Sequence, residues 1–140
     1  MSAKICHKCG AKCCTYFCFQ IDKPEDVDEF EDIRWYLCHN GVSVHIDEGE
    51  WFISIMNRCN MLEENGQCRD YANRPLICRK YDLQNCDHSP GGYGYEEEFK
   101  SPEELEEYAR RTLGAKFDMT RSRKRAGLAK KAQSSAVKAK

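Results

Sequence analysis

The segment CHKCGAKCCTYFC, residues 6–18, decides how this chain folds, because it places five cysteines within thirteen residues. A second group of cysteines follows in the middle of the chain, at Cys59, Cys68, Cys78 and Cys86. Ten cysteines in 140 residues is far above ordinary usage. Thiols at this density are either oxidised to disulfides or held as thiolates by a metal, and the cellular compartment decides between the two.

The start of the chain favours metal over disulfides. Its first ten residues, MSAKICHKCG, contain no apolar segment of the length that a secretory signal needs. No stretch approaches the ~20 consecutive apolar residues that span a bilayer. We therefore expect a cytoplasmic protein that binds no membrane, in which a cysteine array holds metal, with disulfides as the minor alternative.

The length and the composition indicate one small domain. A chain of 140 residues with 32% charged side chains can bury only a modest apolar core, so metal ligation is expected to supply stability that burial does not. We predict a small α+β fold, a metal-stapled cysteine-rich domain with a β-hairpin, two to four helices and long loops.

Between the two cysteine groups, the pattern predicts a helix that begins near Pro24 and ends at Asn40-Gly41. Its apolar residues recur at helical spacing: Val27, Phe30, Ile33 and Leu37. Alternating residues over 42–47 and 51–56 then predict a hairpin. Since its second strand leads directly into Arg58-Cys59, we expect the hairpin to deliver the second cysteine group to the first.

A second helix is predicted after Ser101-Pro102, which supply an N-cap and a proline at the first helical position. Glu104 completes a capping box, and Gly114 ends the helix. The packing stripe repeats at helical spacing: Leu105, Tyr108, Ala109, Thr112 and Leu113.

Charge is unevenly distributed along the chain. Residues 120–140 contain eight Lys or Arg and no acid, whereas residues 1–119 contain 14 bases against 23 acids. We predict a cysteine-cluster domain over residues 1–118 and a basic, disordered tail over residues 119–140, with fluctuating helix at most. The tail solubilises the protein, or else it is a non-specific arm for nucleic acid or an acidic partner.

The spacing of the first cysteines indicates metal chelation. Cys6-x2-Cys9 is the pattern in which two thiolates on one turn reach a single ion, and Gly10 relaxes the backbone behind it. The adjacent Cys13 and Cys14 are most easily explained by two ions or two positions of a cluster; the alternative is that one of them is structural. Cations lie one residue from several cysteines and favour the thiolate form: Lys8, Lys12, Arg58, Arg69 and Arg79.

These residues resemble a known family. The run Cys6-x2-Cys9-Gly10-x2-Cys13-Cys14, followed by Gly66-x-Cys68-x2-Tyr71-x2-Arg74-Pro75-x2-Cys78-Arg79, looks like the CxxCxxCC, or YkgJ-like, cysteine-cluster proteins. The likeness covers roughly residues 5–88, with one residue inserted between Cys9 and Cys13 relative to the family name. The family is described as a zinc- or iron-chelating domain and is similar to the cysteine-rich part of flagellin lysine methylases, for which an iron–sulfur cluster has been proposed.

The resemblance implies a set of metal ligands drawn from both groups: Cys6, Cys9, Cys13, Cys14, Cys59, Cys68, Cys78 and Cys86. Thiolate sites suit both zinc and iron–sulfur clusters, and the resemblance tilts the prediction towards iron. It implies no established reaction.

Other residues are expected to stay outside the metal site. Cys18 and Cys38 are predicted to be small buried hydrophobes. His7 and His88 are expected to be solvated or hydrogen-bonded, and the same analysis places two further histidines at the surface, His39 and His45. Arg74 either braces the site by hydrogen-bonding a carbonyl or thiolate, or is a plain helix-start arginine. The tryptophans are expected in the core: Trp35 and Trp51.

The predicted function is metal binding by a module that presents an acidic body and a basic tail to a protein partner. The alternative is an iron–sulfur enzyme or enzyme subunit, a methyl- or electron-transfer component; a zinc-dependent nucleic-acid-binding module is the weaker alternative. The chain carries no recognisable nucleotide or S-adenosylmethionine loop and no paired acid–base constellation. We therefore expect that this chain alone is not an enzyme.

Overall fold

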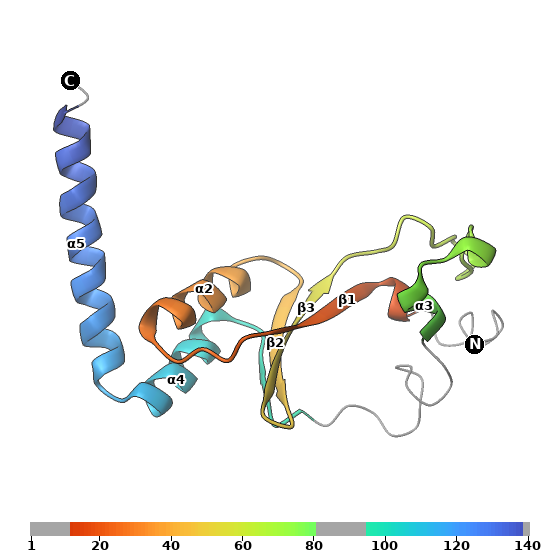
Figure 1. Ribbon diagram of the computed structural model, residues 1–140, viewed down its shortest axis with the longest axis horizontal. Helices are drawn as coiled ribbons and strands as arrows, with labels where there is room; N and C mark the ends of the chain where they lie inside the picture. Colours follow the sequence, from red (N-terminus) through yellow and green to blue (C-terminus); the bar gives the residue numbers. More distant parts are fainter. Residues whose placement is uncertain (1–11, 81–94, 139–140) are drawn as a thin grey trace. The chain divides into compact units, whose positions relative to one another are not determined.

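The computed structural model describes residues 12–80 and 95–138 and contains a small α+β fold (Figure 1). Its elements in chain order are η1 Lys12–Cys14, β1 Tyr16–Ile21, α2 Val27–Leu37, β2 Val42–Asp47, β3 Glu50–Met56, η2 Tyr71–Asn73, α3 Leu76–Lys80, β4 Glu97–Phe99, α4 Pro102–Leu113 and α5 Lys116–Lys138. The strands form one sheet in the order β1-β3-β2-β4. The chain divides into two compact units, one over 1–21 and 41–98, the other over 22–40 and 99–140.

The first unit is built on the predicted hairpin. β2 and β3 pair antiparallel, with Asp47 opposite Glu50 and Val42 opposite Ile55. Glu48 and Gly49 have φ angles of 51° and 81°, as a two-residue turn that matches the twist of the strands requires. Gly41 is also needed, because a Cβ built there lies 3.0 Å from Cβ of Met56. The hairpin prediction is therefore confirmed.

β1 adds a strand that the sequence analysis did not predict. It pairs antiparallel with β3 from Tyr16 opposite Met56 to Ile21 opposite Trp51. Because side chains alternate along a strand, this register gathers apolar residues on one face of the sheet: Phe17, Phe19, Ile21, Val42, Val44, Ile46, Trp51, Ile53 and Ile55. Val44, Ile46, Trp51 and Ile53 are buried, whereas Phe17 and Phe19 stack on each other and stay about half exposed.

The second unit has its own apolar core between three helices. α2 buries Val27, Phe30, Ile33 and Leu37, as predicted. α4 buries Leu105 and Ala109, and its start is capped by Ser101, whose Oγ accepts a hydrogen bond from the amide of Glu104 at 3.3 Å. Phe30 meets Phe117 edge-on with ring centroids 6.3 Å apart. The helix predicted between the two cysteine groups and the helix predicted after Ser101-Pro102 are therefore both confirmed.

The tail differs from its prediction. In place of a disordered segment from residue 119 on, the structure has helix α5, which runs through residue 138 and belongs to the second unit. Ala, Lys and Arg are strong helix formers, and Arg121 ties the first turns of α5 to α2 and α4 by ion pairs with Glu31 and Glu106. Composition alone did not reveal those pairs. No described helix is long and apolar enough to cross a membrane.

Candidate metal centre

Strands β1 and β3 bring the two cysteine groups to the same end of the sheet. β1 starts just after Cys13 and Cys14, and β3 ends just before Cys59. The pairing continues past the strands, because the amide of Asn57 donates to the Thr15 carbonyl at 3.0 Å and that of Cys59 to the Cys14 carbonyl at 2.7 Å. The hairpin therefore brings Cys59 of the second group beside Cys14 of the first, as predicted for these two residues.

The chain after Cys59 folds back on itself in a short loop. Its amides are satisfied locally: Leu62 donates to the Cys59 carbonyl at 3.1 Å, and Met61 donates to Cys59 Sγ at 3.4 Å. Cys68 returns beside Leu62 through an isolated β-bridge. The thiolate is the form of cysteine that binds a metal, and this amide bond holds Cys59 Sγ at the start of the loop.

Cys78 is positioned by the short helix α3. The helix follows Arg74-Pro75, and the Cys78 amide donates to the Pro75 carbonyl at 3.0 Å. Cys68 and Cys78 are half-buried, while Cys59 is exposed. Cys59, Cys68 and Cys78 are all free thiols.

Arginine side chains fix the loops that carry these cysteines. Arg58 Nη2 donates to the Leu62 carbonyl at 3.0 Å, and Arg69 Nη2 donates to the Asn60 carbonyl at 3.2 Å. Further along, Arg79 donates through Nε to the Arg74 carbonyl at 3.3 Å and through Nη2 to the Ala72 carbonyl. The sequence analysis noted these three arginines only as charges beside cysteines, so their role as braces was missed.

Arg74 also contacts a carbonyl, as one of its two interpretations predicted. Its Nη1 donates to the Tyr71 carbonyl at 3.1 Å, and its guanidinium lies over the Tyr71 ring, 3.8 Å from the centroid. Arg74 is half-buried. Such a stacked, hydrogen-bonded guanidinium fixes the turn that leads into α3 and so orients Cys78.

The described residues hold only part of the predicted ligand set. Cys6, Cys9 and Cys86 lie outside them, as do His7 and His88. Between residues 12–80 and 95–138, no three His, Cys, Asp or Glu side chains are grouped as a metal site. The donors therefore fit a thiophilic metal in their chemistry, while the assignment of all eight cysteines as ligands stays a prediction.

Cys18 and Cys38 differ from their predicted burial, since both are exposed. Cys18 lies opposite Ser54 in the sheet, and Ser54 in turn lies opposite Ser43, which places Cys18 on the polar face. Cys38 caps the C-terminus of α2, one residue beyond the last buried position, Leu37. The apolar stripe of the helix ends before it reaches Cys38.

The predicted solvent exposure of one histidine and one tryptophan was also wrong. His45, predicted at the surface, is 7% exposed and stacks between Phe52 and Tyr95 at centroid distances of 5.3 and 4.0 Å. Trp35, predicted in the core, is 62% exposed because it lies on α2 opposite the apolar stripe. Trp51 is buried and His39 exposed, as predicted.

Two cysteine groups on paired strands, with arginine-braced loops, define a cysteine-cluster protein. The chain belongs to the CxxCxxCC family, whose model, described as a putative zinc- or iron-chelating domain, matches residues 5–113. The match extends beyond the segment 5–88 of the sequence resemblance and so also includes β4 and α4, but α5 starts after it ends. Searches among curated proteins and solved structures gave no significant match.

Proposed function

We propose that this protein binds iron as an iron–sulfur cluster through thiolates of its two cysteine groups, with zinc as the competing metal. The family supports chelation of zinc or iron. The observation that carries the proposal is the backbone bond between Cys59 and Cys14, because it joins two cysteines that are 45 positions apart in the sequence. A metal bridging both groups would close the loops that follow β3.

Iron–sulfur ligation is favoured over zinc by the number of thiolate donors and by the hydrogen bond from Met61 to Cys59 Sγ. Backbone hydrogen bonds to sulfur are among the features that tune iron–sulfur clusters. When bound, such a cluster supplies one-electron transfer, whereas zinc would be redox-inert and structural. The protein's own contribution is to hold the thiolates on loops that Arg58, Arg69 and Arg79 brace through backbone carbonyls.

Metal identity is tested by analysing protein purified without oxygen for iron, zinc and acid-labile sulfide, together with its visible spectrum. We expect iron with matching sulfide and a broad absorption near roughly 400 nm, as thiolate-bound clusters show. Colourless protein that contains about one or two zinc ions per chain would overturn the cluster and leave a structural zinc module.

The ligand set is tested by single cysteine substitutions in the same preparation. Cys59→Ser and Cys78→Ser are expected to lower metal stoichiometry, because each removes a thiolate from the site. Cys38→Ser is the matched control, since Cys38 is an exposed free thiol in the other unit. Equal metal loss in all three variants would contradict the proposed ligands.

A further inference from the structure

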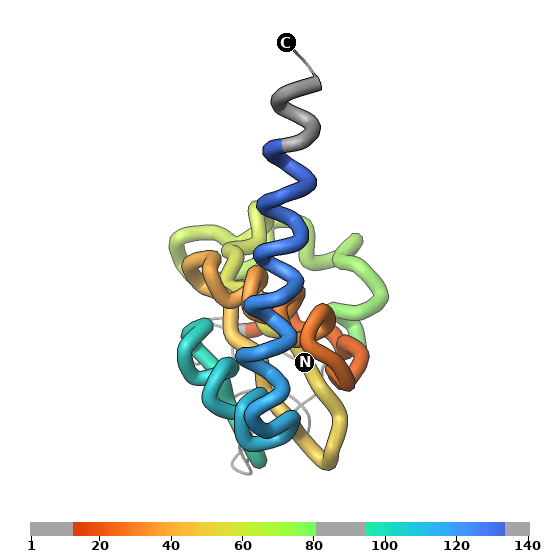
Figure 2. Tube along the Cα trace, turned by 90° about the vertical axis from the view of Figure 1, so that its left-hand side faces the viewer, coloured from red at the N-terminus to blue at the C-terminus, as the bar shows by residue number. Residues whose placement is uncertain are grey.

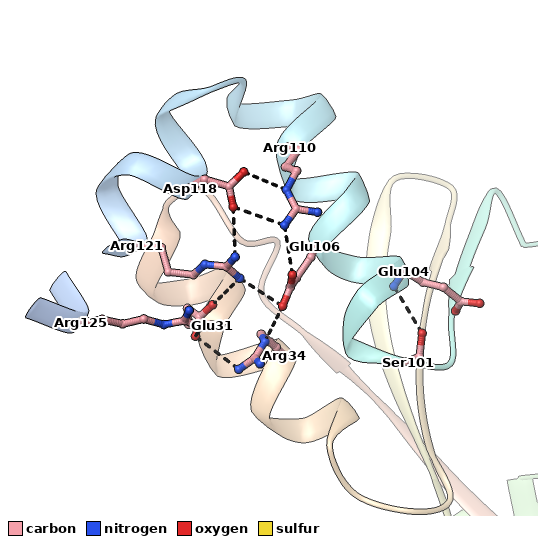
Figure 3. A network of polar contacts seen from close by, with 9 residues as sticks. All are labelled: Glu31, Arg34, Ser101, Glu104, Glu106, Arg110, Asp118, Arg121 and Arg125. Atoms are coloured by element: carbon pink, nitrogen blue, oxygen red, sulfur yellow. Dashed lines mark hydrogen bonds and ion pairs between the residues drawn. The ribbon is translucent and has the colours of Figure 1, made fainter. Parts of the chain in front are cut away.

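The cations of helix α5 fall into two classes, of which the first stabilises the fold. Arg121, whose side chain is 11% exposed, pairs with Glu31 at 3.3 Å and Glu106 at 3.1 Å (Figure 3). Lys124 pairs with Asp28 at 2.8 Å, one turn further along. Arg125 lies 3.7 Å from Glu31, so three of the cations described on α5 pair with carboxylates of α2 and α4.

The second class has no ion pair with a carboxylate among the residues that the structure describes. Lys116, Arg123, Lys130 and Lys131 are exposed and form no ion pair with any described residue. Residues 116, 123 and 130 are seven apart, as are 124 and 131. Because seven residues make nearly two helical turns, residues 116, 123 and 130 form one row with a cation about every 10 Å, and Lys131 lies on the neighbouring row, about two turns beyond Lys124.

Arg123, Lys130 and Lys131 make up what we call the outward face of α5, and Lys130 and Lys131 are the only charged side chains between residues 126 and 133. All side chains described between residues 122 and 133 are exposed. Lys124 and Arg125 still reach carboxylates of α2, and the last described turns of α5 extend beyond α2 and α4 in both views (Figure 1, Figure 2). Asp118, near the start of the helix, is its one acidic residue. Unneutralised like charges on one face repel one another, so an anionic partner would stabilise the helix.

The near absence of apolar and aromatic side chains on this part of α5 limits the classes of partner that it can bind. A membrane surface would require an apolar face, whereas Leu128 is the one large apolar side chain described beyond residue 122. A protein interface is usually anchored by buried aromatic side chains, and a single-stranded nucleic acid is held by aromatic stacking; α5 beyond Phe117 contains no aromatic residue. Phosphates of a duplex, by contrast, are bound by Lys and Arg alone.

We propose that the outward face of α5 binds the phosphate backbone of duplex DNA without reading its sequence. A helix of about 10–12 Å diameter fits the B-form major groove, which is about 12 Å wide, whereas the major groove of duplex RNA is too narrow. α5 starts after the family match ends at residue 113, so this surface is additional to the chelating domain. It does not depend on which metal the cysteines bind.

The test is fluorescence anisotropy of a labelled 24-base-pair duplex of arbitrary sequence, titrated with the full metal-loaded chain from about 50 to 200 mM salt. Lys130→Gln/Lys131→Gln is compared with the matched control Lys23→Gln/Lys100→Gln, which removes the same charge from exposed sites outside α5. Gln keeps helix propensity close to that of Lys, and circular dichroism verifies that the helix is retained.

The unmodified chain is expected to lose affinity steeply with salt, with a logarithmic slope of about −0.9 per phosphate contacted. The double substitution on α5 should reduce that slope by nearly two and lower affinity at the lowest salt by roughly tenfold or more. The control should change affinity by less than about twofold. Equal loss in both variants, binding that is unchanged by the α5 substitution, or tighter binding to phosphatidylserine vesicles or to single strands than to the duplex would overturn the proposal.

Discussion

The helical unit and the cysteine-bearing segment 57–80 are stabilised in different ways. The helical unit buries apolar side chains from three helices and β4, and a network of arginines and carboxylates joins those helices. Within residues 57–80, Leu62 alone is buried, and the loops are held by backbone bonds and arginine-to-carbonyl bonds. The comparison indicates that the first region can fold by apolar burial, whereas the second depends on what its cysteines bind.

Metal removal should separate the two regions and give the largest effect. Metal binding to a small thiolate site contributes on the order of 10 kcal/mol to folding, and segment 57–80 has almost no apolar core to replace it. We expect chelation to abolish hydrogen-exchange protection of the amides of Cys59 and Arg69, which donate to the Cys14 and Met61 carbonyls, while the amides of α2 and α4 stay protected. Exchange that rises equally in both regions, or in neither, would contradict the comparison.

Phe30→Ala should destabilise the helical unit without affecting metal content. Phe30 is 2% exposed and contacts the rings of Tyr108 and Phe117, so the cavity should cost about 3–5 kcal/mol in the free energy of unfolding. Urea denaturation followed by circular dichroism measures it. Trp35→Ala on the opposite face of α2 is the control and should cost less than about 1 kcal/mol. Similar losses in both variants would show that the unit lacks the core described.

The sequence predicted those elements whose pattern lies within one short segment, and it failed for those that depend on pairing with a distant segment. The periods of 3.6 and 2 residues identified α2, α4 and the β2–β3 hairpin, because each of these elements buries one face. β1 and β4 were missed. β1 is a short edge strand whose aromatic residues follow immediately on a cysteine group, and its partner β3 lies more than thirty residues further along the chain.

The errors in single residues have the same origin. The sequence shows that Cys14 and Cys59 belong to cysteine groups, but the hydrogen bond that joins their backbones depends on the pairing of β1 with β3. His45 was predicted at the surface, because the sequence does not reveal that the ring of Tyr95, fifty residues later, stacks on it. The ion pairs that anchor α5 to α2 likewise join residues about ninety positions apart, Arg121 and Glu31 among them.

Glu106→Gln should produce a smaller, pH-dependent loss in the helical unit. Burial raises the pKa of Glu106, but the hydrogen bond from Arg34 and the charge of Arg121 outweigh it and hold the pKa below the usual value. The carboxylate therefore adds stability above the pKa of the unfolded chain, and this is lost as pH falls through the folded pKa. We expect a loss of about 1–3 kcal/mol at pH 7 that shrinks at about pH 3.

Urea midpoints at both pH values measure the effect of Glu106→Gln, with Glu107→Gln as the control. Glu107 is the next residue on α4 and is exposed. Its substitution should change stability by less than about 0.5 kcal/mol at either pH. A loss at Glu106 that is the same at both pH values would mean that shape, and not charge, stabilises the network in Figure 3.

His45 should give the smallest effect, confined to the sheet. Burial lowers the pKa of His45, against the opposing charges of Asp47 and Glu98, so the folded protein holds the ring neutral between Phe52 and Tyr95. A lowered pKa means that the unfolded chain binds the proton more readily. The stabilisation that comes from the neutral His45 ring is therefore fully present above the ordinary histidine pKa of about 6.5. It declines as the pH falls from there towards the lower pKa of His45 in the folded protein.

His45→Phe keeps a planar ring in the stack and removes the titration, so the decline between about pH 7.5 and pH 5 should be flatter than in the unmodified protein. The measurement is the urea midpoint across that range, on metal-loaded protein with metal content checked at each pH. His39→Phe is the control, because His39 is exposed and should leave the pH profile unchanged. If both variants keep the full decline, another group causes it, and the buried ring contributes to packing alone.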